Sequence, residues 1–492
     1  MLFNSISYFL FLPIVLCTYL LLPGKARSGF LLLASYFFYM SWMPQYGLML
    51  FALSSANYFL ALGLSKYGKF KKTILLFGLI LNLGSLCYYK YAIFLLKCAN
   101  DLLSAVTKSS GPAHSYTPFS LPEIILPLGI SFFVFEFIHY LVDVYKGDKA
   151  MRNFVHFSLF AAFFPSQIAG PIKRFQQFSK QIANPEKLDS ERFFQGLSRI
   201  LQGLFKKVAL ADNLALIANP AFQNSASLGT ADAWIATFAF TLQIYFDFSG
   251  YTDIGIGSAK LFGIDLPENF NLPYLAGNLS DFWKRWHISL SSWLRDYLFI
   301  PLGGSRSGKI KTQRNLLITM LLGGLWHGAA WQFVVWGGLH GIGLILNHAY
   351  DGFVEKDNGV STKLKELHRK LPFKLLSSLG TVFFVAIAWV FFRAANLWEA
   401  VKVLKHMFSW STSSVLSEEL KASTLPVAFG IYGLFILLKV LGPKASSGNS
   451  TLKLLFQYLN SGASKAAIGI CAFIAAIAFA PEKASPFIYF QF

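Results

Sequence analysis

Long stretches without a charged residue constrain this chain more than any other feature. Residues 1–24, 28–65 and 315–350 contain no Asp, Glu, Lys or Arg. A helix that crosses a bilayer needs about 20 apolar residues, so the second and third stretches are each long enough for two crossings. Only 14% of the chain is charged, whereas about 25% is usual in soluble domains. The sequence therefore predicts an integral membrane protein.

The apolar segments predict an all-α polytopic fold with about 12 spanning helices, within a range of about 10 to 13. The expected spans are near residues 5–22, 29–43, 46–64, 73–96, 122–143, 153–171, 233–257, 315–331, 333–350, 373–393, 422–441 and 464–481. Residues 191–218 are amphipathic, as in a short buried or interfacial helix. Residues 266–306 mix Pro, Asn, Gly, aromatic and charged residues. Irregular backbone at membrane depth is tolerated only inside protein or beside a watery cavity, so we expect re-entrant or broken helices around a central chamber there.

The net charge of +19 does not indicate nucleic-acid binding, because the basic residues form short clusters between apolar runs. Basic loops usually stay on the cytoplasmic side of a membrane. If the chain crosses the bilayer alternately, the basic loops at 25–27, 66–72 and 146–152 all lie inside, and the N-terminus lies outside. The first apolar segment has no basic residue before it, which favours a retained helix over a cleaved signal.

No polar segment is long enough for a soluble catalytic domain. We expect a single membrane domain over residues 1–492, with N-terminal helices at 1–150, a catalytic core at 151–350 and C-terminal helices at 351–492. Any chemistry must then occur inside the membrane domain or in a separate partner chain. The four cysteines have neither CxxC nor zinc-finger spacing, so we expect neither a disulfide framework nor a metal site.

One histidine stands out in the sequence GGLWHGAAW at 323–331. His327 lies within an uncharged stretch, and Gly324 and Gly328 form a small-xxx-small pair that lets helices approach closely. An ionisable ring inside a membrane is costly and is a functional candidate for that reason. Packing between helices through a hydrogen bond is the alternative. His340 is expected to pack, on a different helical face if one helix continued through both histidines.

Three other segments carry polar residues that could belong to a site. Residues 282–296 (FWKRWHISLSSWLRD) combine cations with a second imidazole, although aromatic and basic residues are also typical of a membrane-surface helix. Glu136, His139 and Asp143 share one helix face, where pairing with Arg or Lys is favoured over metal binding. Residues 164–174 (FPSQIAGPIKR) indicate a broken helix.

These motifs, taken together, resemble the membrane-bound O-acyltransferase family, in its bacterial branch similar to alginate O-acetyltransferase. The similarity covers nearly the whole chain. Its strongest parts are PLGISFFVFE (127–136), FPSQIAGPIKR (164–174), YFDFSGYTDIGIG (245–257), ENFNLPYLAGNLSDFWKRWHISLSSWLRDYLFIPLGG (268–304), LWHGAAWQFVVWGGLHG (325–341) and the terminal FIYFQF (487–492).

The resemblance implies a ring of helices around a funnel or tunnel, with His327 and His287 as catalytic residues. It also implies that substrate contacts come from Trp326, Arg285, Asp281, Gln167 and Asp247. Neutral imidazole can accept a hydroxyl proton near neutral pH, so we expect His327 to be the base. His287 or Arg285 would then stabilise the developing oxyanion.

The expected function is acetyl transfer from a cytoplasmic thioester, acetyl-CoA or an acyl carrier, across the inner membrane of a bacterium. The acceptor would be an extracytoplasmic polysaccharide of the alginate or peptidoglycan type. It would be reached through a separate acetyltransferase- or esterase-like protein, since a polymer cannot enter a helix bundle. We expect no bound cofactor and, as other partners, only membrane lipids. Transfer of D-alanine to teichoic acid is the second candidate. A transporter or flippase without acyl-transfer chemistry is the candidate from another class.

Overall fold

The computed structural model describes residues 1–107, 119–168, 170–306, 308–354, 370–412, 462–481 and 485–488, together with isolated residues between 362 and 433. The described residues form helices joined by turns, and none of them belongs to a strand. The all-helical prediction is therefore confirmed. The expected span at 422–441 falls mostly outside the described residues.

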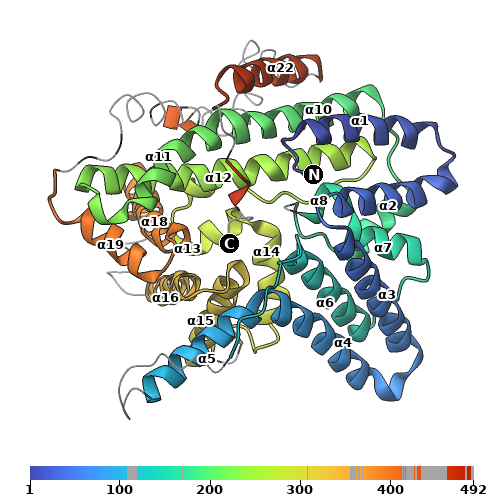
Figure 1. Cartoon of the computed structure of the whole chain (residues 1–492), viewed down its shortest axis with the longest axis horizontal. Coiled ribbons are helices and arrows are strands. Elements are labelled where there is room, and N and C mark those ends of the chain that lie inside the picture. The colour runs from blue at the N-terminus through green and yellow to red at the C-terminus, as the bar shows by residue number, and fades with distance from the viewer. Residues whose placement is uncertain are drawn as a thin grey trace.

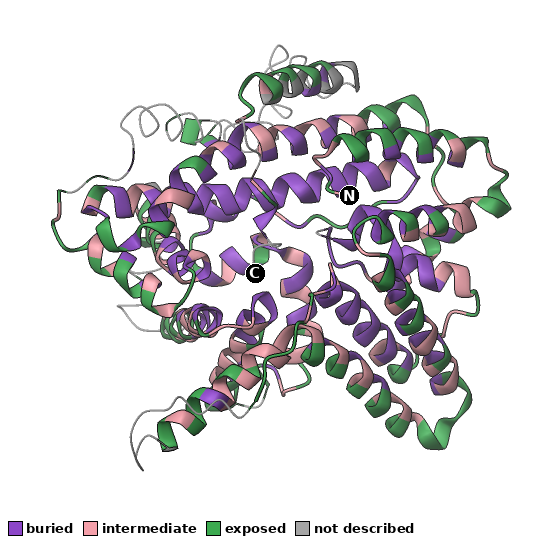
Figure 2. Ribbon diagram, viewed as in Figure 1, coloured by how far each residue is buried: buried purple, intermediate pink, exposed green. Residues whose placement is uncertain are grey.

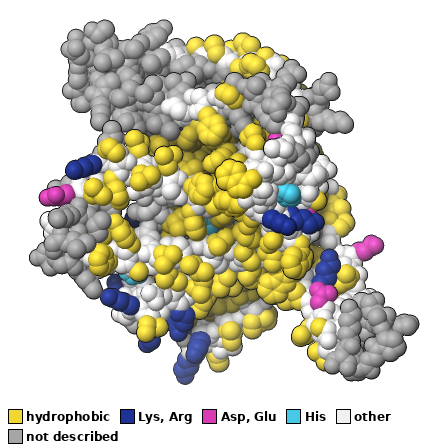
Figure 3. Space-filling view, turned by 90° about the vertical axis from the view of Figure 1, so that its left-hand side faces the viewer, with side chains coloured by type: hydrophobic (Ala, Val, Ile, Leu, Met, Phe, Trp, Pro, Cys, Tyr) yellow, Lys and Arg dark blue, Asp and Glu magenta, His cyan; other side chains and the backbone are white. Residues whose placement is uncertain are grey.

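The N-terminal helices form an outer layer with apolar faces turned away from the protein. This layer consists of α1 (Ile6–Leu21), α2 (Gly24–Met40), α3 (Pro44–Lys66), α4 (Lys71–Leu86) and α5 (Ala92–Thr107). Large apolar side chains such as Ile6, Ile14, Leu33 and Leu48 are exposed on it. Hydrophobic side chains also gather on another face, the left-hand side of Figure 1, which Figure 3 shows. Such a surface suits contact with lipid rather than water.

The centre of the molecule is built on α12 (Thr230–Leu261), which is buried along most of its length (Figure 2). It lies beside α10 (Ser190–Leu204), as Figure 1 shows, and α22 (Gly462–Ala478) packs on the other side of α10. Glycines allow this contact: a Cβ atom on Gly203 would lie 2.5 Å from the carbonyl oxygen of Gly250, and one on Gly257 would lie 2.6 Å from that of Gly196. The glycines at 247–257 thus serve helix packing.

Two expected spans differ from the structure. In place of a helix at 122–143, α6 runs over Ile130–Lys146 and starts after Gly129, whose φ of +72° favours glycine. In place of a helix at 153–171, α7 (Phe154–Ala162) stops before α8 (Phe164–Gln167), and α9 (Phe175–Ala183) follows. Pro165 lies in the first turn of α8, where its missing N–H costs nothing, so the broken helix predicted at 164–174 is confirmed.

The remaining helices surround the short elements predicted at 266–306. These short elements are α13 (Leu279–Arg285), α14 (Ile288–Leu294) and a π-helical turn (Arg295–Phe299). Beside them lie α15 (Lys309–His327), α16 (Trp331–Val354), α18 (Leu371–Arg393) and α19 (Leu397–Met407). The amphipathic segment at 191–218 forms α10, a π-helical stretch and α11 (Asp212–Gln223).

The helices α15 and α16 form a tight antiparallel hairpin. A Cβ atom on Gly337 would lie 2.3 Å from the carbonyl oxygen of Met320, so the close approach predicted for Gly324 occurs, against α16. Gly328 lies outside α15 as its C-cap. Because the chain turns there, no single helix carries both His327 and His340, and the two histidines contact the same ring, Trp336.

Among the described residues, three helices are long and apolar enough to cross a membrane by length and composition alone: Pro44–Lys66, Gly68–Val106 and Pro372–Arg393. The helix Ile6–Leu21 is apolar but shorter. Other expected spans are interrupted, as at α7 and α8, or carry internal polar groups, as in α12. These helices pack on one another inside the protein, where charged groups can pair, as Asp253 of α12 does with Arg199 and Lys206.

Candidate active site

His327 is the last residue of α15, and its position is fixed from outside that helix. The last carbonyl groups of a helix have no partner within it. Here the Tyr91 hydroxyl donates to the carbonyl of Leu325 (2.8 Å), and the Lys90 ammonium donates to the carbonyls of Trp326 (2.5 Å) and His327 (3.1 Å). A cation at a helix C-terminus also stabilises the helix dipole. The π-helical turn Cys87–Tyr91 thus holds the end of α15.

His287 lies between α13 and α14 in a strained left-handed conformation, with φ of +43°. The Asn269 side-chain oxygen lies 3.2 Å from its Nδ1 and accepts from the backbone N–H (3.2 Å) and hydroxyl (2.9 Å) of Ser289. A backbone N–H can only donate, so this atom of Asn269 is an acceptor and Nδ1 of His287 must donate to it. The ring then carries its proton on Nδ1 and offers an unprotonated Nε2.

The two imidazoles lie close together inside a shell of aromatic rings. The ring centroids of His287 and His327 are 6.5 Å apart, near enough for one small substrate group to reach both. Trp326 contacts both rings, at 6.0 Å from His287 and 5.0 Å from His327, and Trp336 lies 5.1 Å from His327. His287 is fully buried and His327 is 4% exposed. Such a dry site strengthens electrostatic contacts with a reacting group.

A cavity of about 240 Å³ reaches His327, whereas His287, which contacts Trp326, is fully buried and does not line it. Its walls include His327, Trp326, Lys90 and Trp42. His327 is therefore not sealed by packing, and a small substrate group has a path to it. A cavity of this size admits a small group but not a polymer.

The expected substrate contacts fall in different places. Trp326 touches both histidines, as described above. Asp281 and Arg285 pair with each other on α13 (2.8 Å) and are each about one third exposed, although His287 is only two residues from Arg285. Gln167 is buried in α8, and no described residue hydrogen-bonds to its side-chain amide. That amide could therefore bind a ligand, and these substrate roles stay predictions.

Asp247 lies in a buried ion pair. Its carboxylate is 2.8 Å from the ammonium of Lys207, which also contacts Asp212 at 2.7 Å. The backbone N–H of Ile488 donates to Asp247 (2.7 Å), and Phe487 stacks on Tyr251 at 4.0 Å. These contacts give Asp247 a structural part, because they anchor the segment 485–488 against α12.

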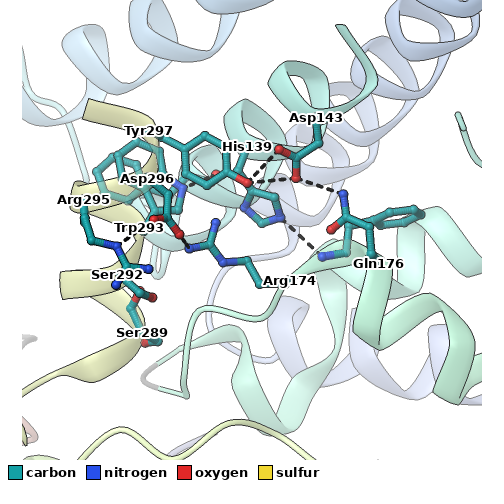
Figure 4. Close-up of polar contacts among 12 residues, drawn as sticks. His139, Asp143, Arg174, Gln176, Ser289, Ser292, Trp293, Arg295, Asp296 and Tyr297 are labelled. Atoms are coloured by element: carbon teal, nitrogen blue, oxygen red, sulfur yellow. Dashed lines mark hydrogen bonds and ion pairs between the residues drawn. The ribbon is translucent and has the colours of Figure 1, made fainter. Parts of the chain in front are cut away.

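A separate polar cluster lies at the end of α6 (Figure 4). Asp143 accepts from the hydroxyl of Tyr297 (2.8 Å) and from Gln176 (2.9 Å), while Arg174 pairs with Asp296 (2.7 Å). Burial, together with the neighbouring Asp143, raises the pKa of the Tyr297 hydroxyl, so that it stays a donor.

On the same face of α6, Glu136 pairs with Lys173 at 2.7 Å, and His139 accepts from the backbone N–H of Phe175. The ion-pair interpretation of this helix face is confirmed for Glu136.

Sequence reasoning did not single out Lys90 and Asn269. The sequence did contain an indication for Lys90, because it lies inside the span expected at 73–96. Charged residues within membrane spans usually have a function. Asn269 had none beyond its place in the segment most similar to the family, because its contact with His287 depends on how the chain folds back across 18 residues.

The fold and site define a class: a helical membrane protein with two buried histidines side by side, one of which lines a cavity. The sequence profile of the membrane-bound O-acyltransferase family matches residues 130–386. The protein described as probable alginate O-acetylase AlgI of Azotobacter vinelandii is 38% identical, with 99% of each chain covered. The peptidoglycan O-acetyltransferase of Helicobacter pylori is 39% identical over 83% of this chain and 80% of its own. The teichoic acid D-alanyltransferase of Bacillus subtilis is 31% identical over 47% of this chain.

The chain therefore belongs to the membrane-bound O-acyltransferase family. It is a multi-pass membrane protein and an O-acyltransferase, which removes the transporter candidate from consideration.

Proposed function

We propose that this enzyme transfers acetyl groups from a thioester donor in the cytoplasm towards a polysaccharide outside the bacterial inner membrane. The similarity to alginate and peptidoglycan O-acetylating enzymes over most of the chain supports the acetyl group and the polysaccharide. The match to D-alanyl transferases covers less than half of this chain, so that alternative ranks second. The observation that carries the proposal is the close pair of His287 and His327, of which His327 lines an accessible cavity.

The histidine pair suits acyl transfer to a hydroxyl group. The acceptor oxygen attacks the thioester carbonyl carbon, a C–O bond forms, and the C–S bond breaks. One imidazole takes the proton of the hydroxyl and returns it to the departing sulfur as a thiol. The Nε2 atom of His287 can accept this proton, because Asn269 holds the single N–H proton of the neutral ring on Nδ1. His327 then contacts the carbonyl oxygen as negative charge develops on it, which exchanges the roles first expected of the two rings.

The cavity at His327 favours a small intermediate acceptor over a polymer. Its volume of about 240 Å³ excludes a polysaccharide chain, so a partner protein would receive the acetyl group and pass it on. Trp42 and Ile125 line the same cavity, and Tyr46 hydrogen-bonds to the carbonyl of Ile125. The alternating threading of the chain assigns the uncharged loop at 42–46 to the outer face. The cavity would then open outwards, towards the acceptor.

The test uses the full chain in sealed proteoliposomes. Acetyl-CoA labelled in its acetyl group is supplied on one side, and a candidate partner with its polysaccharide is supplied on the other. We expect labelled acetyl on the far side for the wild type and loss of at least a hundredfold for His327→Ala. Equal transfer by wild type and His327→Ala, in correctly folded protein, would refute the proposal. Label that appears only when donor and acceptor share one side would refute the transmembrane direction.

A further inference from the structure

A second opening lies between α13, α16 and α18. This cleft has a volume of about 860 Å³, within the range of small-molecule sites. Small residues line much of it, among them Gly277, Gly343, Gly380 and Ser377. Polar residues, including Lys374 and Asn347, also line it. The cleft is therefore lined by both small and polar residues.

The cleft and the cavity at His327 lie at opposite ends of α16. The helix has 24 residues and begins at Trp331, just after the turn that follows His327. At 1.5 Å per residue it is about 36 Å long. The residues of α16 that line the cleft lie between 343 and 351, in the second half of the helix. An enzyme with these two openings can receive two substrates from opposite sides.

A buried histidine lies behind the inner wall of the cleft. Phe384 lines the cleft, and its ring contacts His340 at 5.8 Å. His340 is fully buried, and neither ring nitrogen has a hydrogen-bond partner among the described residues. Buried polar groups in proteins are nearly always paired. His340 also contacts Trp336 (4.8 Å), which contacts His327 (5.1 Å), so it is one ring away from the reactive pair.

We propose that the acyl donor enters through this cleft and that His340 hydrogen-bonds to its flexible arm. The donor class is an acyl thioester on a slender amide-containing arm of the phosphopantetheine type, shared by coenzyme A and acyl carrier proteins. A neutral imidazole has one donor and one acceptor, which match the C=O and N–H of an amide group in that arm. Phe384 stands between the cleft and His340 and moves aside when the arm is bound. This proposal rests on the function proposed above.

Another hollow is a weaker candidate for the donor entrance. Arg199 and Lys206 line it, but the carboxylate of Asp253 pairs with both cations, and Glu268 pairs with Arg199. These cations are already neutralised. The described residues of that hollow include no buried histidine that lacks a partner.

The first variant narrows the cleft without disturbing the packing. A Cβ atom on Gly380 meets nothing within 4 Å, so Gly380→Leu places a side chain in open space. We expect the KM for acetyl-CoA to rise at least tenfold, with kcat at saturating donor and the KM for acceptor unchanged. Gly84→Leu is the matched control, because Gly84 also has open space around it, on α4. An unchanged donor KM in Gly380→Leu would overturn the proposal.

The second pair of variants tests His340 itself. We expect His340→Leu to raise the donor KM about tenfold and His340→Gln to recover part of the loss, because Gln can both donate and accept. A packing residue would give the opposite order, with Leu tolerated better than Gln. Acetyl-CoA and an acetylated carrier protein are tested in parallel. If the variants raise the KM for both donors, His340 recognises the arm that the two donors share. The donor that the wild type uses is then identified by which of the two it accepts.

A binding measurement separates this proposal from the proposed function. Labelled acetyl-CoA and acetylated carrier protein are each bound to His327→Ala protein, with and without Gly380→Leu. Loss of donor binding in the double variant supports the cleft as the donor site. This holds even if no acceptor is ever acetylated, and in that case only the proposed function fails. Binding unaffected by Gly380→Leu, together with loss of a co-purifying lipid, would assign the cleft to lipid and overturn the proposal.

Discussion

Replacing Asn269 by Ala is expected to lower the turnover number of acetyl transfer about ten- to hundredfold. The oxygen of Asn269 holds the proton of His287 on Nδ1 at 3.2 Å. Loss of one neutral hydrogen bond costs about 1 to 1.5 kcal/mol, which is about five- to tenfold in rate. Without Asn269, the His287 ring can also carry its proton on Nε2. A protonated Nε2 cannot accept the proton of the hydroxyl group, so turnover falls further.

The companion variant Asn269→Asp keeps an acceptor for His287 and for both donors of Ser289. We expect it to retain most of the turnover. Its negative charge favours the protonated ring, so the pH at which the rate is half-maximal should move upwards.

The assay measures initial rates in proteoliposomes between pH 5 and 9, beside the melting temperature of each variant. Asn269→Ala also leaves the buried donors of Ser289 unpaired, at about 1 to 3 kcal/mol each, and the melting temperature separates that loss of stability from a loss of turnover. Asn271→Ala, on the same loop, is the control. Wild-type turnover and an unshifted pH profile in folded Asn269→Ala protein would refute the assignment of the His287 proton.

Three further predictions concern the support of the site. Lys90→Met should lower turnover about tenfold and Lys90→Arg should recover part of it, since a charged hydrogen bond contributes about 1.5 to 3 kcal/mol to holding the end of α15; equal rates for both variants would contradict this. Lys207→Met should destabilise the protein by about 3 to 5 kcal/mol, because it leaves the buried carboxylates of Asp247 and Asp212 without their cation, and a thermal melt identical to wild type would show that these ion pairs are not coupled to folding. Gly203→Leu should prevent close packing of α10 on α12 at Gly250, seen as loss of monodisperse protein in size-exclusion chromatography, whereas the same profile as wild type would mean that the helices tolerate the added side chain.

The sequence predicted the fold class because hydrophobic length is a strong signal. The breaks in the fold were readable where proline and glycine require them, as at Pro165. The start of α6 was readable too, because Pro122, Pro127 and Gly129 precede it, but the prediction followed the apolar residues of 122–143 instead.

The candidate site was predicted in part. His327 and His287 could be named from the resemblance, and the structure brings their rings together. Arg285 is two residues from His287 in sequence, but its guanidinium pairs with Asp281, one turn earlier in α13, and its substrate role stays a prediction. Asn269 and Lys90 depend on contacts between segments 18 and more than 200 residues apart, and no local pattern reports those.

The segment 485–488 carries a consequence for how the enzyme is made. Phe487 packs against Phe248, whose ring supports His287 at 4.7 Å, while Ile488 caps the carboxylate of Asp247. More than 200 residues separate Asp247 from Ile488, so α12 leaves the ribosome long before the segment 485–488 is synthesised. Until then a lysine and two aspartates in the bilayer lack their final backbone ligand. We therefore expect a chain that ends before residue 485 to lack these contacts and to be less stable and less active than the full chain.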